Sequence, residues 1–325
     1  MFNRLYKNIK VNILNDWLKK KEAFKLLIAT TNNDRNNLLE ILTYLKNIYC
    51  NTLKKLVYFH KYNIKIYSLK ITNLEMLNYV SKHPEIVRYI KELYMGYDVY
   101  SCIFDNNDCI ENLIIQATQS NPFEVQQIIK KYNLKRLHIQ SLFQVDHCCL
   151  KSLNHLKIKS FVYDIKPIAE NCFNLISIDI VTHLKNINLV IENNPNLEEI
   201  TLNSRIDIAN VVKPKKLKSL HLNAGYFSRT SFDTIKSYEL TALSIINPSK
   251  NLFKLCINLR DIFRPNLRYL NLQNCRIDYE IIIVNVLTCE KLEKLGFTAY
   301  KSIEKLTCVN VLENITWINE LFLSN

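Results

Sequence analysis

The chain has 325 residues, of which 48% are hydrophobic and 22% charged, and its 43 Lys and Arg against 30 Asp and Glu leave a formal net charge of +13. It contains only 3 glycines, whereas an average usage of roughly 7% would give about 23. Rossmann and P-loop nucleotide sites, which need clustered glycines, are therefore excluded. No apolar run of about 18 residues and no secretory signal is expected. The 10 cysteines form no C-x-x-C pair, so we expect an intracellular protein, cytoplasmic or nuclear, with reduced thiols.

Residues 1–65 form the first predicted segment, and their apolar pattern is helical. One helix is expected over residues 11–29. A second, amphipathic helix is predicted because apolar residues recur at steps of three and four: Leu38, Leu42, Leu45, Tyr49, Leu53 and Leu56. A stack of repeats needs a terminal element with one polar side, so we interpret these helices as a short α-helical N-terminal cap.

The same segment carries most of the net charge. It holds 13 Lys and Arg against 4 Asp and Glu, a net charge of +9 out of the chain's +13. A basic surface of this kind suits RNA, a ribosome or an acidic protein partner, although exposed lysine-rich helices are also common without one. The candidate contact residues are Lys19, Lys20, Lys21, Lys25, Lys54 and Lys55.

From residue 66 to residue 325 a six-residue phrase recurs, with the spacing L-x-x-L-x-L. Its twelve copies follow one another at intervals of 19 to 27 residues. They begin at Ile66, Ile90, Ile110, Leu134, Leu153, Leu175, Leu197, Leu217, Leu240, Leu267, Leu292 and Ile318. One copy cannot bury its apolar face alone, so a fixed period predicts stacked strands whose three aliphatic residues point inward.

The copy "LRYLNLQNCRIDYEIIIVNVLTCEKLEKL" resembles the cysteine-containing leucine-rich repeats, with Cys275 and Ile277 after the phrase and Cys289 three residues before Leu292. "CFNL" at residues 172–175 has the same opening, while most other copies lack a counterpart of Cys275. The resemblance implies an α/β leucine-rich-repeat solenoid (horseshoe) of about twelve repeats over residues 66–325, with a parallel sheet on its concave side. Ribonuclease-inhibitor-like and F-box/leucine-rich-repeat proteins are of this type.

Such repeats often follow an F-box, and the segment "NLLEILTYLKNIYCNTLKKLVYF" resembles that motif in part. The similarity lies in its Leu-Ile-Tyr-Leu pattern, but the segment lacks the motif's Leu-Pro start and a Trp near its end. The resemblance implies one alternative function, a ubiquitin-ligase substrate receptor, by analogy of fold and not from a site.

No catalytic motif of the G-x-S-x-G or H-E-x-x-H kind occurs, so we expect a protein that is not an enzyme and takes no small-molecule substrate. His147, Cys148 and Cys149 form a run of residue types that can bind metals. Adjacent residues cannot easily all face one ion, and no second ligand pair has zinc-site spacing. We therefore predict no metal site and no cofactor.

The residues between the inward aliphatics are predicted to line the concave face, and their charge alternates along the stack. A basic band is followed by acidic Asp179, Glu198 and Glu199, and then by a second basic and aromatic band. The candidate partner-binding residues are Lys135, Arg136, His138, His155, Lys157, Lys159, Lys218, His221, Arg268 and Tyr269. A surface whose charge alternates in sign suits an elongated protein partner better than it suits a phosphate backbone, which is negative throughout.

These observations predict a non-enzymatic intracellular interaction scaffold that binds a protein partner on its concave face. One alternative is an RNA- or ribosome-associated factor that docks through the basic N-terminal helices, and the other is the F-box-like receptor.

Overall fold

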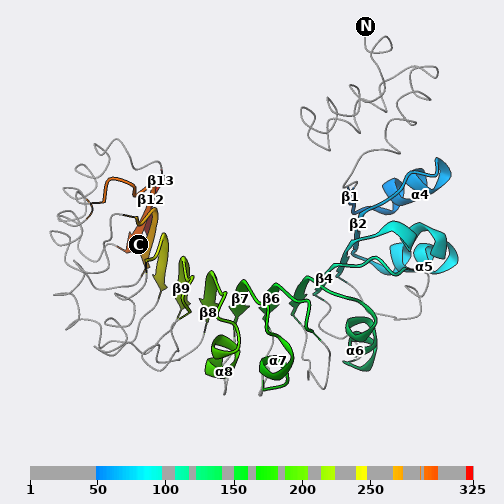
Figure 1. Ribbon diagram of the computed structural model, residues 1–325. Helices are drawn as coiled ribbons and strands as arrows, with labels where there is room; N and C mark the ends of the chain where they lie inside the picture. The colour runs from blue at the N-terminus through cyan, green and yellow to red at the C-terminus, as the bar shows by residue number, and fades with distance from the viewer. Residues whose placement is uncertain are drawn as a thin grey trace, which may run out of the picture. The chain divides into compact units, whose positions relative to one another are not determined.

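The computed structural model of the chain describes residues 49–96, 107–116, 122–140, 150–159, 166–181, 187–203, 214–223, 239–246, 266–273, 286, 289–298 and 320–324. It divides into two compact units, Met1–Ser141 and Leu142–Asn325. Both have the same construction, in which parallel strands follow one another in chain order and are joined by helix-containing connections (Figure 1). The helix predicted over residues 11–29 lies outside the described residues.

The first unit contains five of the described strands. In chain order it has β1 (Tyr49–Cys50), α4 (Leu53–Lys61), β2 (Ser68–Ile71), α5 (Leu74–Lys82), the 3-10 helix η2 (Pro84–Tyr89), β3 (Glu92–Met95), β4 (Asn112–Ile115), α6 (Pro122–Lys131) and β5 (Arg136–Ile139). Each strand pairs in parallel with the next one.

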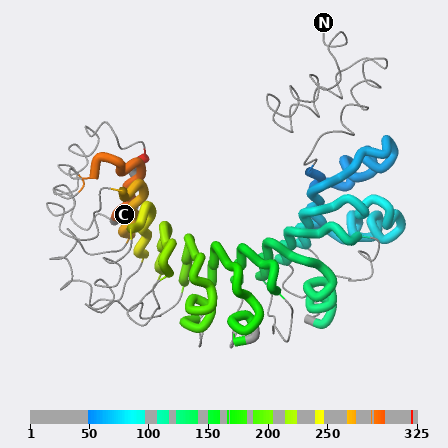
Figure 2. Tube along the Cα trace, in the orientation of Figure 1, coloured from blue at the N-terminus to red at the C-terminus, as the bar shows by residue number. Residues whose placement is uncertain are grey.

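The second unit contains the other eight. Its elements are β6 (His155–Ile158), α7 (Lys166–Asn171), β7 (Ser177–Ile180), α8 (Ile187–Glu192), β8 (Glu199–Leu202), β9 (Ser219–Asn223), β10 (Ala242–Ile246), β11 (Tyr269–Gln273), β12 (Lys294–Thr298) and β13 (Glu320–Ser324). These strands also form one parallel sheet in chain order. Figure 2 traces the same succession of strand and connection within each unit.

The strands stand where the repeated phrase predicts them. All twelve from β2 to β13 begin two residues after the start of a predicted phrase. Their register keeps the phrases in phase, because the second aliphatic residue of one phrase pairs with the second of the next, as in Leu69 with Leu93 and Leu270 with Leu295. The prediction of an α/β fold with parallel strands and interspersed helices is confirmed, and the arrangement is consistent with a solenoid.

The inward direction of the phrase is confirmed by burial. All 33 aliphatic or aromatic residues at the three apolar positions of the first eleven phrases are at most 5% exposed. The helices bury their own apolar residues at the same core, for example Met76 and Val80 on α5 and Val190 on α8. The core is therefore a continuous column of aliphatic side chains in each unit, as stacking of incomplete repeats requires.

The predicted amphipathic helix over Leu38–Leu56 is wrong at Tyr49 and Cys50. These residues form β1, which pairs Cys50 with Leu69 and extends the sheet one strand before the first predicted phrase. The helix α4 begins only at Leu53, because the extended residue Thr52 caps it with its side chain accepting a hydrogen bond from the Lys55 N–H. Burial at 0% places Cys50 in the core, where other copies have Leu or Ile.

The position three residues before a phrase is buried in most of the described copies, although Asn63 and Lys131 are exposed there. Asn107, Cys172, Asn194 and Cys289 occupy it and are each 0% exposed. Burial raises the pKa of the Cys172 thiol to about 12, so this cysteine stays protonated and packs as a small apolar group. The asparagines act differently, because a buried amide must satisfy its hydrogen bonds.

Each of these asparagines ties its repeat to the preceding one. The Asn194 Nδ2 donates to the Cys172 carbonyl at 2.8 Å and to the Val190 carbonyl at 2.7 Å, while its Oδ1 accepts from the Leu175 N–H at 2.7 Å. In the first unit the Asn107 Nδ2 likewise donates to the Val87 and Ile90 carbonyls of the repeat before it. The turn that precedes one strand is thus hydrogen-bonded to the turn that precedes the neighbouring strand.

We expect Asn194→Ala to lower the free energy of unfolding by about 3 kcal/mol, because it leaves one buried N–H and two buried carbonyls without their partner. Urea unfolding of the full chain measures the change. The matched control is Asn196→Ala, which alters an exposed residue of the same turn and should cost less than about 0.5 kcal/mol. Equal midpoints for the two variants would contradict the fastening role.

Candidate functional site

The candidate site is the face of each sheet opposite the aliphatic core, which we call the open face. Side chains alternate along a strand, so the residues between the buried aliphatics point to this face. The described helices lie on the other side of the strands (Figure 1). Most open-face residues, such as Tyr94 on β3 and Tyr269 on β11, are half-buried between their neighbours on the adjoining strands.

In the first unit the open-face residues contact one another from strand to strand. The Ser68 hydroxyl donates to Glu92 Oε2 at 2.7 Å, and Lys70 Nζ lies 4.1 Å from the centre of the Tyr94 ring. At the edge of this face Glu111 accepts from Lys135 at 2.7 Å and from Lys91 at 3.4 Å. The hydrogen bond from Lys135 is the main cause that lowers the pKa of the Glu111 carboxyl.

The second unit repeats this arrangement with four ion pairs between neighbouring repeats. Lys157 pairs with Asp179, Lys218 with Glu198 at 2.8 Å, Arg268 with Glu293 at 3.4 Å, and Lys294 with Glu320 at 2.6 Å. Exposed pairs of this kind contribute about 0–1 kcal/mol each to stability. Their larger consequence is that the predicted basic and acidic bands neutralise each other across the strands.

Strands β9 to β11 carry a patch without formal charge, which we call the polar patch: Ser219, His221, Ser244, Tyr269 and Asn271. His221, Ser244 and Asn271 stand side by side in register. The His221 Nε2 lies 2.9 Å from the Ser219 hydroxyl, and its ring centre lies 5.8 Å from that of Tyr269. The patch therefore combines an imidazole, a phenol and small polar groups in one contiguous surface.

Two members of the polar patch are buried although they belong to the open face. Ser244 is 3% exposed and Asn271 is 8% exposed. The Oδ1 atom of Asn271 is buried and accepts no hydrogen bond from the described part of the chain. An unsatisfied buried acceptor costs about 1–3 kcal/mol, so this oxygen is able to accept a further hydrogen bond.

The environment of His221 favours the neutral imidazole. Burial is the main cause that lowers the pKa of His221 below its ordinary value of 6.5, while the carboxylates of Glu199 and Asp179 oppose the shift. At neutral pH the ring therefore offers one donor and one acceptor and carries no charge. The polar patch is a hydrogen-bonding surface under those conditions.

The structure places the predicted partner-binding residues in four situations. Lys135, Lys157, Lys218 and Arg268 are held in ion pairs, and His221 and Tyr269 belong to the polar patch. Arg136 and Lys159 are exposed and have no ion pair among the described residues. His138, with Nε2 3.4 Å from Gln140 Nε2, and His155 occupy open-face positions of β5 and β6.

Only some of the candidate contact residues of the basic segment lie in the described part of the chain. Lys54 and Lys55 lie on α4, and Lys55 Nζ donates to Asn51 Oδ1 at 3.0 Å. Lys19, Lys20, Lys21 and Lys25 lie outside the described residues, as do Cys275 and the run from His147 to Cys149. Sequence reasoning missed Ser244 and Asn271, although the period marks both, because they occupy the position of His221 in the next two copies.

One group of three ligand-type side chains comes together in the described residues, formed by His60, His83 and Glu85. It belongs to α4, α5 and η2 and not to the strands of the open face.

Comparison with known proteins does not assign the chain to a family. Neither the scan against models of protein families nor the search of curated proteins found a match. Among the described residues, no helix is both long and apolar enough to cross a membrane.

We expect the pH dependence of stability to reveal His221. Since its folded pKa lies below 6.5, the unfolded chain takes up a proton that the folded chain does not, so stability falls as pH drops from that value through the folded pKa. His221→Gln should remove this part of the loss. The midpoints of urea unfolding of the original chain and of His221→Gln, at about pH 7.5 and about pH 5.5, measure this loss of stability. An equal acid-induced loss in both proteins would contradict the assignment.

Proposed function

We propose that the chain is a non-enzymatic interaction scaffold of the leucine-rich-repeat type, which binds a protein partner on the open face of its sheets. The observation that carries the proposal is that strands β2 to β12 bury their aliphatic residues on one side, while their other side is mostly polar and is not covered by any of the described helices. A stacked sheet of this construction offers a long surface whose residues are held in fixed register.

The charge arrangement favours a protein over a nucleic acid as the partner. A phosphate backbone would need cations free to contact it, but Lys157, Lys218 and Arg268 are already paired with carboxylates. A protein partner with charges of both signs can exchange such pairs one by one, which gives specificity and register. The uncharged polar patch with Tyr269 would then supply the anchor, as tyrosine often does in interfaces.

The pair of Ser219 and His221 invites comparison with a catalytic serine and its base, but its surroundings favour binding. Acyl transfer needs hydrogen-bond donors aimed at the developing oxyanion. The strand β9 that carries both residues pairs with β8 and β10, so its backbone N–H groups are used in the sheet. The pair is therefore better suited to hold a partner's polar groups than to stabilise a tetrahedral intermediate.

We expect Tyr269→Ala to weaken partner binding about 10- to 30-fold, which corresponds to about 1.4–2 kcal/mol for an interface anchor. The partner is first recovered with the tagged full-length chain from its own cells, and its affinity is then measured with purified components. The matched control, Phe173→Ala, removes an aromatic side chain that is 45% exposed in the same unit but is not on a strand. The control should stay within about twofold of the original affinity. A partner lost equally with both variants would contradict binding on the open face.

A second candidate function, docking on RNA or a ribosome, is favoured by one observation, the net charge of +9 in residues 1–65. If it is correct, the main partners disappear on RNase treatment, and affinity falls about 10³-fold or more between 50 and 200 mM salt if at least six phosphates are contacted. A protein partner that survives RNase and higher salt would contradict it.

The F-box-like function stays a prediction, whose test is binding of an adaptor of the ubiquitin system to residues 1–60.

A further inference from the structure

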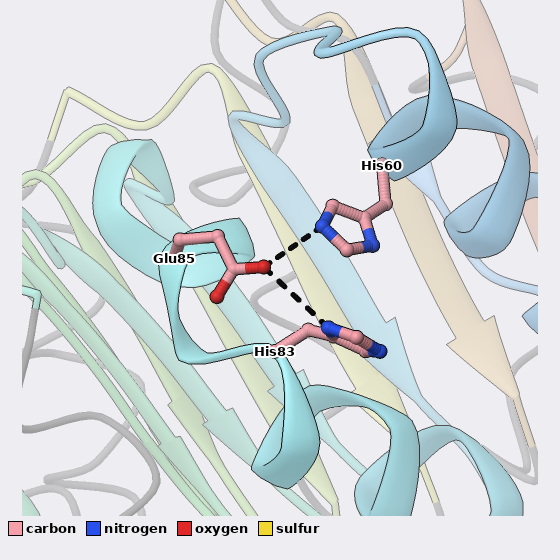
Figure 3. A group of neighbouring side chains, drawn as sticks. All are labelled: His60, His83 and Glu85. Atoms are coloured by element: carbon pink, nitrogen blue, oxygen red, sulfur yellow. Dashed lines mark ion pairs between the residues drawn. The ribbon is translucent and has the colours of Figure 1, made fainter.

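Three side chains of the first unit converge outside the open face. His60 is in the last turn of α4, His83 caps the C-terminus of α5, and Glu85 is in the first turn of η2. The Glu85 Oε1 lies 2.8 Å from His60 Nε2 and 3.5 Å from His83 Nδ1 (Figure 3). The centres of the two imidazole rings are 4.5 Å apart. Both imidazoles thus turn a nitrogen toward the same carboxylate oxygen.

The donor set is one that divalent transition metals use in proteins. Two imidazole nitrogens and one carboxylate oxygen form a frequent three-ligand zinc set, with a fourth position for water. The three donor atoms lie within 4.8 Å of one another. With metal–ligand bonds of about 2.1 Å, tetrahedral donors stand about 3.4 Å apart, so the present separations need only small side-chain rotations to admit an ion.

Tyr79 of α5 supports the first imidazole from behind. Its hydroxyl lies 3.0 Å from His60 Nδ1, and the two rings pack edge to face at 5.9 Å. In the arrangement without an ion, the Tyr79 O–H donates to Nδ1 while the Nε2–H donates to Glu85. When Nε2 binds a metal, the proton moves to Nδ1 and is donated to the Tyr79 oxygen. Metal-binding histidines commonly have such a second partner, and here it fits both tautomers.

The backbone holds the three ligands in place. Pro84 stands between His83 and Glu85 at the start of η2, and its ring fixes the backbone angle that separates them. Buried Phe59, Val80 and Val87 anchor the three helical segments in the core. The side chains themselves are reachable from solvent, because His60 is 28% exposed and His83 is 37% exposed. The group is therefore both preorganised and accessible to a hydrated ion.

The position of the group in the fold indicates what an ion would do there. Among the described residues, strand β1 pairs with β2 at two positions, whereas β2 and β3 pair at four. In that part of the chain, the repeat that contains α4 has the shortest sheet connection of the first unit. A bond network from α4 to α5 and η2 would fasten that repeat to the next one.

We propose that His60, His83 and Glu85 form a binding site for a divalent transition-metal ion of the zinc type, with Tyr79 as a positioning residue. The ion takes three protein ligands and one water, and it clamps α4 to α5 and η2. Binding is a ligand exchange without redox chemistry, in which waters of the hydrated ion are replaced by two neutral imidazoles and one carboxylate.

The test uses the reduced full-length chain and ZnCl₂ as the probe. Isothermal titration should show one equivalent of Zn²⁺ that Glu85→Gln binds at least 10-fold more weakly, and Tyr79→Phe should also weaken binding about 10-fold. Since the 10 cysteines can bind Zn²⁺ as well, the difference between the original chain and its variants is the readout. X-ray absorption at the zinc edge should assign that equivalent to nitrogen and oxygen ligands without sulfur.

The matched control is Glu75→Gln, which neutralises an exposed carboxylate in the first turn of α5 and should leave Zn²⁺ binding unchanged. Thermal unfolding separates a metal site from a simple hydrogen-bond network. Zn²⁺ should raise the melting temperature of the original chain and of Glu75→Gln but not that of Glu85→Gln. Equal binding by Glu85→Gln and the original chain, or sulfur ligands at the zinc edge, would overturn the proposal.

Discussion

The structure depends on the alignment of one repeat with the next. A phrase of six residues buries its three aliphatic side chains only when the neighbouring phrase presents its own in the same register. The pairing of Leu69 with Leu93, and of Leu243 with Leu270, keeps this alignment through repeats of unequal length. Differences in length are absorbed by the connections, because a slip of one residue would turn the aliphatics to the polar side.

The same alignment determines the chemistry of the open face. Residues one repeat apart become neighbours, so a lysine in one copy meets a carboxylate in the adjoining copy, as Lys218 meets Glu198. Similar residues meet as well, which is how His221, Ser244 and Asn271 form a contiguous polar patch. In the proposed scaffold, the fixed register of these charges and hydrogen-bonding groups would supply specificity, although the separate ion pairs contribute little to stability.

The sequence predicts what depends on the period and fails where a second interaction decides. All twelve phrases give strands in the expected places, because their aliphatic residues have no other core to join. The strand β1 was missed because Leu53 and Leu56 continue the helical spacing of the preceding residues, while Thr52 ends that spacing by capping a new helix. The bonds of Asn194 were missed because an isolated asparagine in a sequence does not reveal whether its amide is buried.

The convergence of His60, His83 and Glu85 follows from the period too, although local spacing conceals it. His60 and His83 are 23 residues apart, about one repeat, so corresponding positions of adjoining copies come face to face. A search for metal ligands limited to short motifs passes over such pairs, whereas a search at the repeat length would find them. In a stacked protein, functional groups therefore assemble across repeats. Both the polar patch and the histidine group have this origin, one on the strands and the other on the helices.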